Sequence, residues 1–139
     1  MNGLPFTILI VEDDADDRFI IDEAFKQIGY EAEVKKFLSG ESLFRYLNEI
    51  KTNVYPSLIV LDNTLPKMDA SDILLLLKKD TRFHKIPVVV YTSTASPQKK
   101  EQLLAHGAYA CLEKGALMDE VVTVAKDLKS LAEENVGDQ

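Results

Sequence analysis

Residues able to bind a metal ion or a phosphoryl group follow four separate segments of the sequence. A pair of carboxylates, Glu12 and Asp13, follows one apolar run, and a third carboxylate, Asp62, follows a second run. The hydroxyl of Thr92 ends a third apolar run, and the ammonium of Lys114 follows a shorter segment of mixed polarity. If these groups meet, they could bind a divalent cation and stabilise a phosphoryl group.

Clustered carboxylates repel one another unless a cation lies between them. Two carboxylates about 5 Å apart repel by roughly 3 kcal/mol at an effective dielectric constant of about 20. Ligands that are all oxygen favour Mg²⁺ or Mn²⁺, whereas zinc favours histidine and cysteine. A carboxylate can also accept a phosphoryl group once the charge of that group is neutralised by a metal ion and a lysine ammonium.

Each of these residues alone has an ordinary explanation. Acidic residues at strand ends usually lie in turns or cap helices, and we expect that role for Asp14, Asp16 and Asp17. Thr92 alone would be a strand terminus, and Lys114 alone would be a surface charge. The combination of these residue types at four segment ends is what indicates a site.

Five strands must position these residues. The apolar runs at 8–11, 58–61 and 88–91 are rich in β-branched and aliphatic residues, which is typical of strands buried on both faces. The segments 33–38 and 109–113 have mixed polarity, so we expect them at the edges of the same sheet.

Helical spacing of apolar residues fills the gaps between the strands. The expected helices cover 16–28, a stretch that follows Ser39, 71–79, a segment that Ser96-Pro97 opens and Gly107 ends, and about 118–131. This alternation predicts an α/β fold with a doubly wound, five-stranded parallel sheet in the flavodoxin-like order 2-1-3-4-5. The carboxyl ends of its strands, where ligands bind in such sheets, then meet at one edge.

Composition narrows the class of protein. The 139 residues suit one domain, and 46% apolar with 28% charged residues is typical of a globular protein. Because no long apolar run or basic N-terminal segment occurs, we expect neither membrane insertion nor secretion. The single cysteine, Cys111, favours a cytoplasmic location. A net charge of −7 argues against direct binding of nucleic acid.

The sequence resembles the receiver domain of two-component response regulators, the CheY-like family, over about residues 6–131. The matching motifs are 8–13 with the acidic pair, Arg18, the acceptor strand and loop at 58–69 with Pro66 four residues after Asp62, 87–92, and Gly107-Ala108 leading to Lys114. The resemblance implies one receiver domain over 1–139, with a frayed tail at 134–139 and no output domain.

The resemblance also implies a role for each site residue. Asp62 would accept the phosphoryl group, and Thr92 and Lys114 would bind its oxygens. Mg²⁺ (or Mn²⁺) would be held by four groups: the carboxylates of Glu12, Asp13 and Asp62 and the backbone carbonyl of Thr64. The donor would be a phosphohistidine on a histidine kinase or histidine phosphotransfer protein. The chain would be a switch rather than an enzyme, one that catalyses its own phosphorylation and hydrolysis and signals to an unknown downstream protein or passes the group onward.

Three positions depart from the family pattern. Gly115 stands where proline usually follows the lysine, Ala70 stands where glycine is usual, and Cys111 stands where a tyrosine or phenylalanine usually swings inward. We therefore expect a trans Lys114–Gly115 bond, with glycine freedom placing the lysine. We also expect Tyr109 not to swing inward, so that the output would come from 92–106.

Three alternatives are weighed against this interpretation. A pseudo-receiver would share the fold without phosphorylation, but the acidic, hydroxyl and lysine positions are intact. A flavodoxin-like cofactor carrier would want a glycine- or hydroxyl-rich phosphate loop, and 12–17 is acidic instead. A phosphatase with an aspartyl nucleophile would want a general acid two residues later, where Thr64 stands.

Overall fold

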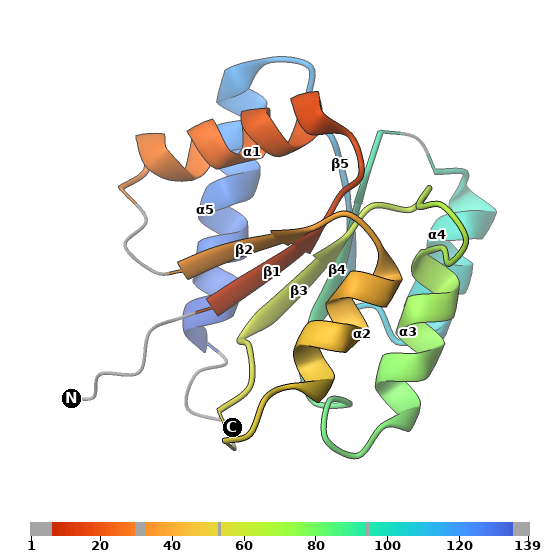
Figure 1. Cartoon of the computed structure of the whole chain (residues 1–139). Coiled ribbons are helices and arrows are strands. Elements are labelled where there is room, and N and C mark those ends of the chain that lie inside the picture. Colours follow the sequence, from red (N-terminus) through yellow and green to blue (C-terminus); the bar gives the residue numbers. More distant parts are fainter. Residues whose placement is uncertain (1–6, 30–32, 53, 94, 135–139) are drawn as a thin grey trace.

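Strands and helices alternate along the whole described chain (Figure 1). The computed structural model describes residues 7–29, 33–52, 54–93 and 95–134. The strands are β1 (Thr7–Val11), β2 (Glu33–Phe37), β3 (Leu58–Leu61), β4 (Val88–Thr92) and β5 (Ala110–Glu113). The helices are α1 (Ala15–Gln27), α2 (Gly40–Asn48), α3 (Ala70–Lys79), α4 (Pro97–Ala105) and α5 (Met118–Glu134).

The strands form one parallel sheet in the order β2-β1-β3-β4-β5, which confirms the predicted fold class. The register pairs Val11 with Leu61, Leu61 with Val90, and Thr92 with Glu113. The last residues of β1 and β3 are therefore direct neighbours. The three apolar runs are central, as expected, and β2 and β5 are the edges.

The sheet separates two apolar cores, because strand side chains alternate between its faces. Leu58 and Val60 of β3 point into one core with α1 and α5, whereas Ile59 and Leu61 point into the other with α2, α3 and α4. Figure 1 shows these two groups of helices on opposite faces of the sheet. Burial of each such aliphatic side chain contributes roughly 1.5–3 kcal/mol to folding. The well-packed cores on both faces therefore hold the strand ends in fixed positions.

Side-chain caps fix where the helices begin. Ser39 caps α2 in a reciprocal pair with Ser42. Ser96 caps α4 directly before Pro97, and the sequence predicted this cap. Asp69 caps α3 through Asp72, so that helix begins one residue earlier than expected. The last helix reaches Glu134, and residues 135–139 of the expected frayed tail lie outside the described residues. No helix among the described residues has the length and apolar character needed to cross a membrane.

The edge strand β2 carries charge on both of its faces. Lys35 lies over the ring of Tyr46, with its Nζ 5.3 Å from the ring centroid, and pairs with Glu33 at 3.0 Å. Lys36 pairs with Asp22 of α1 at 2.8 Å. Mixed polarity at this position is what identified the segment as an edge, and the structure confirms it.

Candidate functional site at the carboxyl edge of the sheet

The site residues meet because the strand ladders continue one residue past the strands themselves. The backbone N–H of Glu12 donates to the carbonyl of Phe37 at 2.9 Å, and that of Asp62 donates to Val11 at 3.1 Å. The N–H of Lys114 donates to the carbonyl of Thr92 at 2.9 Å. Each functional residue is thus held by its backbone against a neighbouring strand.

The three carboxylates come together as predicted. One oxygen from each of Glu12, Asp13 and Asp62 lies within 4.8 Å of the other two. Glu12 is only 4% exposed and Asp62 only 7%, whereas Asp13 is exposed to solvent. This arrangement is an all-oxygen site with two buried anchors and one open side, which suits a partly hydrated Mg²⁺ or Mn²⁺ ion.

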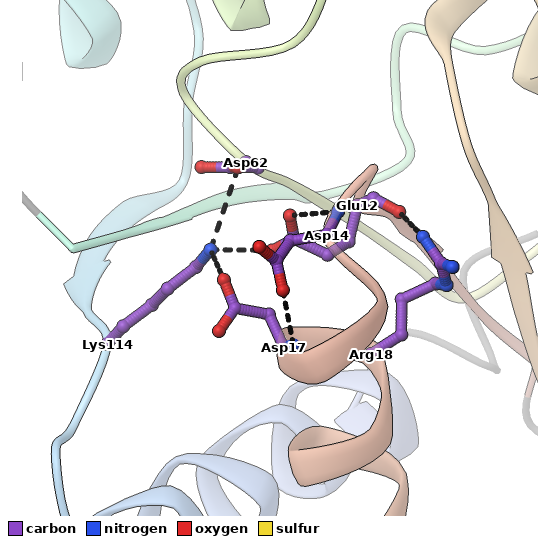
Figure 2. A network of polar contacts seen from close by, with 6 residues as sticks. All are labelled: Glu12, Asp14, Asp17, Arg18, Asp62 and Lys114. Carbon is purple, nitrogen blue, oxygen red and sulfur yellow. Dashed lines mark hydrogen bonds and ion pairs between the residues drawn. The ribbon is translucent and has the colours of Figure 1, made fainter.

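The Lys114 ammonium lies among carboxylates (Figure 2). Its Nζ is 2.6 Å from Oε1 of Glu12, 2.8 Å from Oδ2 of Asp17 and 3.6 Å from Oδ2 of Asp62. The ring of Tyr91 lies beneath it, with the Nζ 5.9 Å from the ring centroid. Lysine therefore reaches the predicted acceptor, but its two shortest contacts are to other acids.

Helix α1 holds the acidic loop that contributes to the site. The Asp14 side chain accepts a hydrogen bond from the Asp17 N–H at 3.0 Å, which makes it the helix cap that we expected. The Arg18 guanidinium donates to the carbonyl of Glu12 at 2.8 Å. These contacts fix the turn between β1 and α1. Figure 2 shows Arg18 and Asp14 on either side of Glu12 in this turn.

Sequence reasoning missed the role of Asp17, which was expected to be only a first-turn residue. Its carboxylate instead points to Lys114, from the third residue of α1. An acid three residues after an aspartate cap normally indicates a capping box, in which its side chain binds the cap's backbone N–H. Here the N–H of Asp14 donates to Glu12 at 3.3 Å, which leaves the Asp17 carboxylate available for the lysine.

Burial and pairing shift the acidity of both central groups. Burial raises the pKa of the Glu12 carboxyl to about 7, although the hydrogen bond from Lys114 opposes this; the charge of Asp62 adds to the rise. Burial alone would lower the pKa of Lys114, but hydrogen bonds to Asp17 and Glu12 and the charges of Glu12 and Asp62 raise it above its ordinary value. The ammonium is thus charged at neutral pH, while Glu12 can exchange its proton there.

The Lys114–Gly115 bond is trans, as predicted, since the described residues contain no cis peptide bond. The expected reason for glycine was wrong. Gly115 is not among the described residues of positive φ; instead, a Cβ atom there would collide with the Cβ of Glu120. The Glu120 carboxylate accepts from the N–H groups of Ala116 at 3.2 Å and Leu117 at 3.0 Å. Glycine is therefore required by close packing against α5.

The remaining site residues have clear positions. Thr92, the last residue of β4, is buried, and Thr64 lies in the exposed loop two residues after Asp62. Cys111 packs against the core on the α3 and α4 side, while Tyr109 is 58% exposed. Whether Tyr109 stays outward on phosphorylation and whether the output comes from 92–106 both stay predictions, and Thr94 lies outside the described residues.

Residues 8–126 match the family of response regulator receiver domains. The chain belongs to this family. Receiver domains accept a phosphoryl group from histidine kinases, so the chain is a phosphoacceptor response regulator of two-component signalling, a signalling switch. Membership sets aside the flavodoxin-like carrier and the phosphatase.

Individual similar proteins and solved structures agree with this family. A probable methanogenesis regulatory protein, FilR2 of Methanothrix harundinacea, is 28% identical over 90% of this chain and 82% of its own length. The crystal structure of the phosphorylated cyanobacterial phytochrome response regulator RcpA superposes with a TM-score of 0.82 at 26% identity, covering 94% of this receiver and 95% of that chain. The Mn²⁺-bound form of response regulator Rcp1 gives 0.77 at 25% identity, covering 91% and 93%.

Proposed function

We propose that Asp62 is the residue that accepts the phosphoryl group. The observation that supports this is its position: its buried carboxylate lies within 4.8 Å of the acidic pair and 3.6 Å from the Lys114 ammonium. An Asp62 oxygen attacks the phosphorus of a phosphohistidine and forms an O–P bond. The N–P bond of the donor breaks, and its electron pair returns to the imidazole.

Four groups would hold a divalent cation: the carboxylates of Glu12, Asp13 and Asp62, and the backbone carbonyl of Thr64. The all-oxygen donor set fits Mg²⁺, and the related Rcp1 binds Mn²⁺ in its structure. A bound cation supplies charge neutralisation at the phosphoryl oxygens. Lys114 donates to one of those oxygens, and the hydroxyl of Thr92 donates to another.

The partner that supplies the phosphoryl group is a histidine kinase or a histidine phosphotransfer protein, in the cytoplasm. The phosphorylated form then binds a downstream protein or passes the group onward. Self-catalysed hydrolysis of the aspartyl phosphate would return the chain to its unphosphorylated state. The charge of −7 supports a protein partner rather than direct contact with nucleic acid.

Phosphotransfer from a phosphorylated histidine kinase tests this function. We expect the chain to gain one phosphoryl group with Mg²⁺ and none with a chelator. Reduction of the acyl phosphate with borohydride should convert residue 62 to homoserine, which peptide mass spectrometry detects. Absence of any labelling by kinase and by acetyl phosphate would instead favour the pseudo-receiver, and a homoserine elsewhere would exclude Asp62.

The affinity for Mg²⁺ is expected to rise about tenfold from about pH 6 to about pH 8, because the ion competes with a proton on Glu12. The pKa of about 7 places this carboxyl in its protonated form below that range and in its ionised form above it. Calorimetric titration in buffers of different ionisation enthalpy should also show proton release near pH 7. In Glu12→Gln the pH step should vanish, and a parent affinity that does not change with pH would contradict the prediction.

A further inference from the structure

We propose that Asp17 is a positioning residue that holds the Lys114 ammonium beside Asp62 during phosphoryl transfer. The proposal rests on the function proposed above. Its starting point is the 2.8 Å contact between Oδ2 of Asp17 and Nζ of Lys114, which joins residues 97 positions apart. The Lys114 side chain is only 12% exposed and that of Asp17 is 38% exposed, so the contact is shielded from solvent mainly on the lysine side.

Asp17 is a rigid support because its own backbone is fixed. It is the third residue of α1, and its N–H donates to the capping carboxylate of Asp14 at 3.0 Å. Its side chain has few rotatable bonds, whereas immobilising a lysine stem costs up to roughly 2 kcal/mol of conformational entropy. A short carboxylate on a helix end can therefore hold the long side chain in place from its far end.

The geometry leaves one lysine donor for the reacting group. An ammonium has three N–H donors. Two of them are used by Glu12 at 2.6 Å and by Asp17 at 2.8 Å. No third hydrogen bond from this ammonium occurs among the described residues, and the Asp62 carboxylate, 3.6 Å from the Nζ, forms an ion pair too long for a hydrogen bond. A phosphoryl oxygen on Asp62 would come within reach of the third donor.

The two carboxylates that hydrogen-bond to Lys114 differ in whether they could also bind a metal ion. Glu12 belongs to the cluster that can bind a metal ion, so its oxygens would be shared with a bound ion. Asp17 does not belong to that cluster and serves Lys114 alone among the contacts described. Asp17 is therefore the partner that can keep the ammonium in place when Glu12 would be binding a metal ion.

A charge effect and a positioning effect make opposite predictions. Removing a negative charge near the site reduces repulsion of an anionic donor and would speed phosphorylation. Losing the support of Lys114 would slow it. Asp16 is the matched control, because it is the adjacent exposed acid of the same first turn and its side chain makes no hydrogen bond or ion pair among the described residues.

The test compares phosphorylation by acetyl phosphate at saturating Mg²⁺ in Asp17→Ala, Asp17→Asn and Asp16→Ala. We expect Asp17→Ala to be slower than Asp16→Ala by about tenfold, the size associated with loss of one hydrogen bond to a charged group. Asp17→Asn keeps an acceptor oxygen and should lie between them. In a Lys114→Ala background the effect of Asp17→Ala should disappear, because the cycle isolates the coupling between the two residues.

A second readout does not depend on phosphorylation. Lys114 can be acylated with an amine-reactive acylating reagent, and peptide mass spectrometry then measures the rate. Acylation should be faster in Asp17→Ala than in the parent and in Asp16→Ala. Equal rates of phosphorylation in Asp17→Ala and Asp16→Ala, or unchanged acylation of Lys114, would overturn the positioning role alone. A parent protein that accepts no phosphoryl group would overturn the proposed function, and this role with it.

Discussion

Asp62→Asn is expected to accept no phosphoryl group from acetyl phosphate or from a phosphorylated kinase. The amide nitrogen and the neutral carbonyl oxygen that replace the carboxylate are too weak as nucleophiles to form the O–P bond. The fold should be retained, since Asn has nearly the same shape and the change removes one of the clustered negative charges around Glu12. Intact-protein mass spectrometry after incubation with donor and Mg²⁺ measures the result.

The control for this substitution is Asp16→Asn, which makes the same chemical change at an exposed acid of the same edge. It should be labelled like the parent. Circular dichroism of both variants should match that of the parent, which separates loss of the acceptor from loss of structure. Labelling of Asp62→Asn to the parent level would show that another residue is the acceptor.

Asp13→Ala is expected to remove measurable Mg²⁺ binding and, with it, labelling by acetyl phosphate. Asp13 is the exposed member of the three-carboxylate cluster that could hold a metal ion. Mg²⁺ sites in proteins usually have only one or two carboxylate ligands and several waters, so we expect the loss of one carboxylate to have a large effect. We expect the affinity to fall by at least about tenfold, as judged by calorimetric titration.

The stability of Asp13→Ala separates ligand loss from damage to the fold. Because the side chain is exposed and its charge repels its neighbours, the metal-free variant should unfold at the same temperature as the parent or higher. Addition of Mg²⁺ should raise the unfolding temperature of the parent and of Asp16→Ala, but not that of Asp13→Ala. An equal rise in all three proteins would place the ion elsewhere.

Strand order and strand type were predictable because the central strands of a parallel sheet are buried on both faces and therefore have nearly continuous apolar sequences. The runs at 58–61 and 88–91 contain no polar residue before the strand end, which is possible only where both faces are covered. Helix ends were less predictable. Asp69 and Ala70 could equally have been turn residues, and only the reciprocal pair with Asp72 shows that α3 begins there.

The site was predictable as far as backbone topology determines it. Parallel strands bring Glu12, Asp62 and Lys114 to one edge whatever their side chains do. The contact of Asp17 was not predictable in this way, because it depends on the angle of α1 and on the rotamer of a residue whose position resembles a capping box. The need for glycine at position 115 was also not predictable, because it follows from the close approach of Glu120 on α5.

The charged edge strand β2 has a consequence for how the protein behaves at high concentration. An open strand edge offers unpaired N–H and C=O groups that can recruit a strand from another molecule. Pairing of β2 with β2 of a second copy would bring the lysines at 35 and 36 of the two copies close together. It would also disturb the ion pairs of these lysines with Glu33 and Asp22. Lysine on both faces of the edge strand therefore discourages edge-to-edge pairing of sheets, which protects the protein from aggregating through its own sheet.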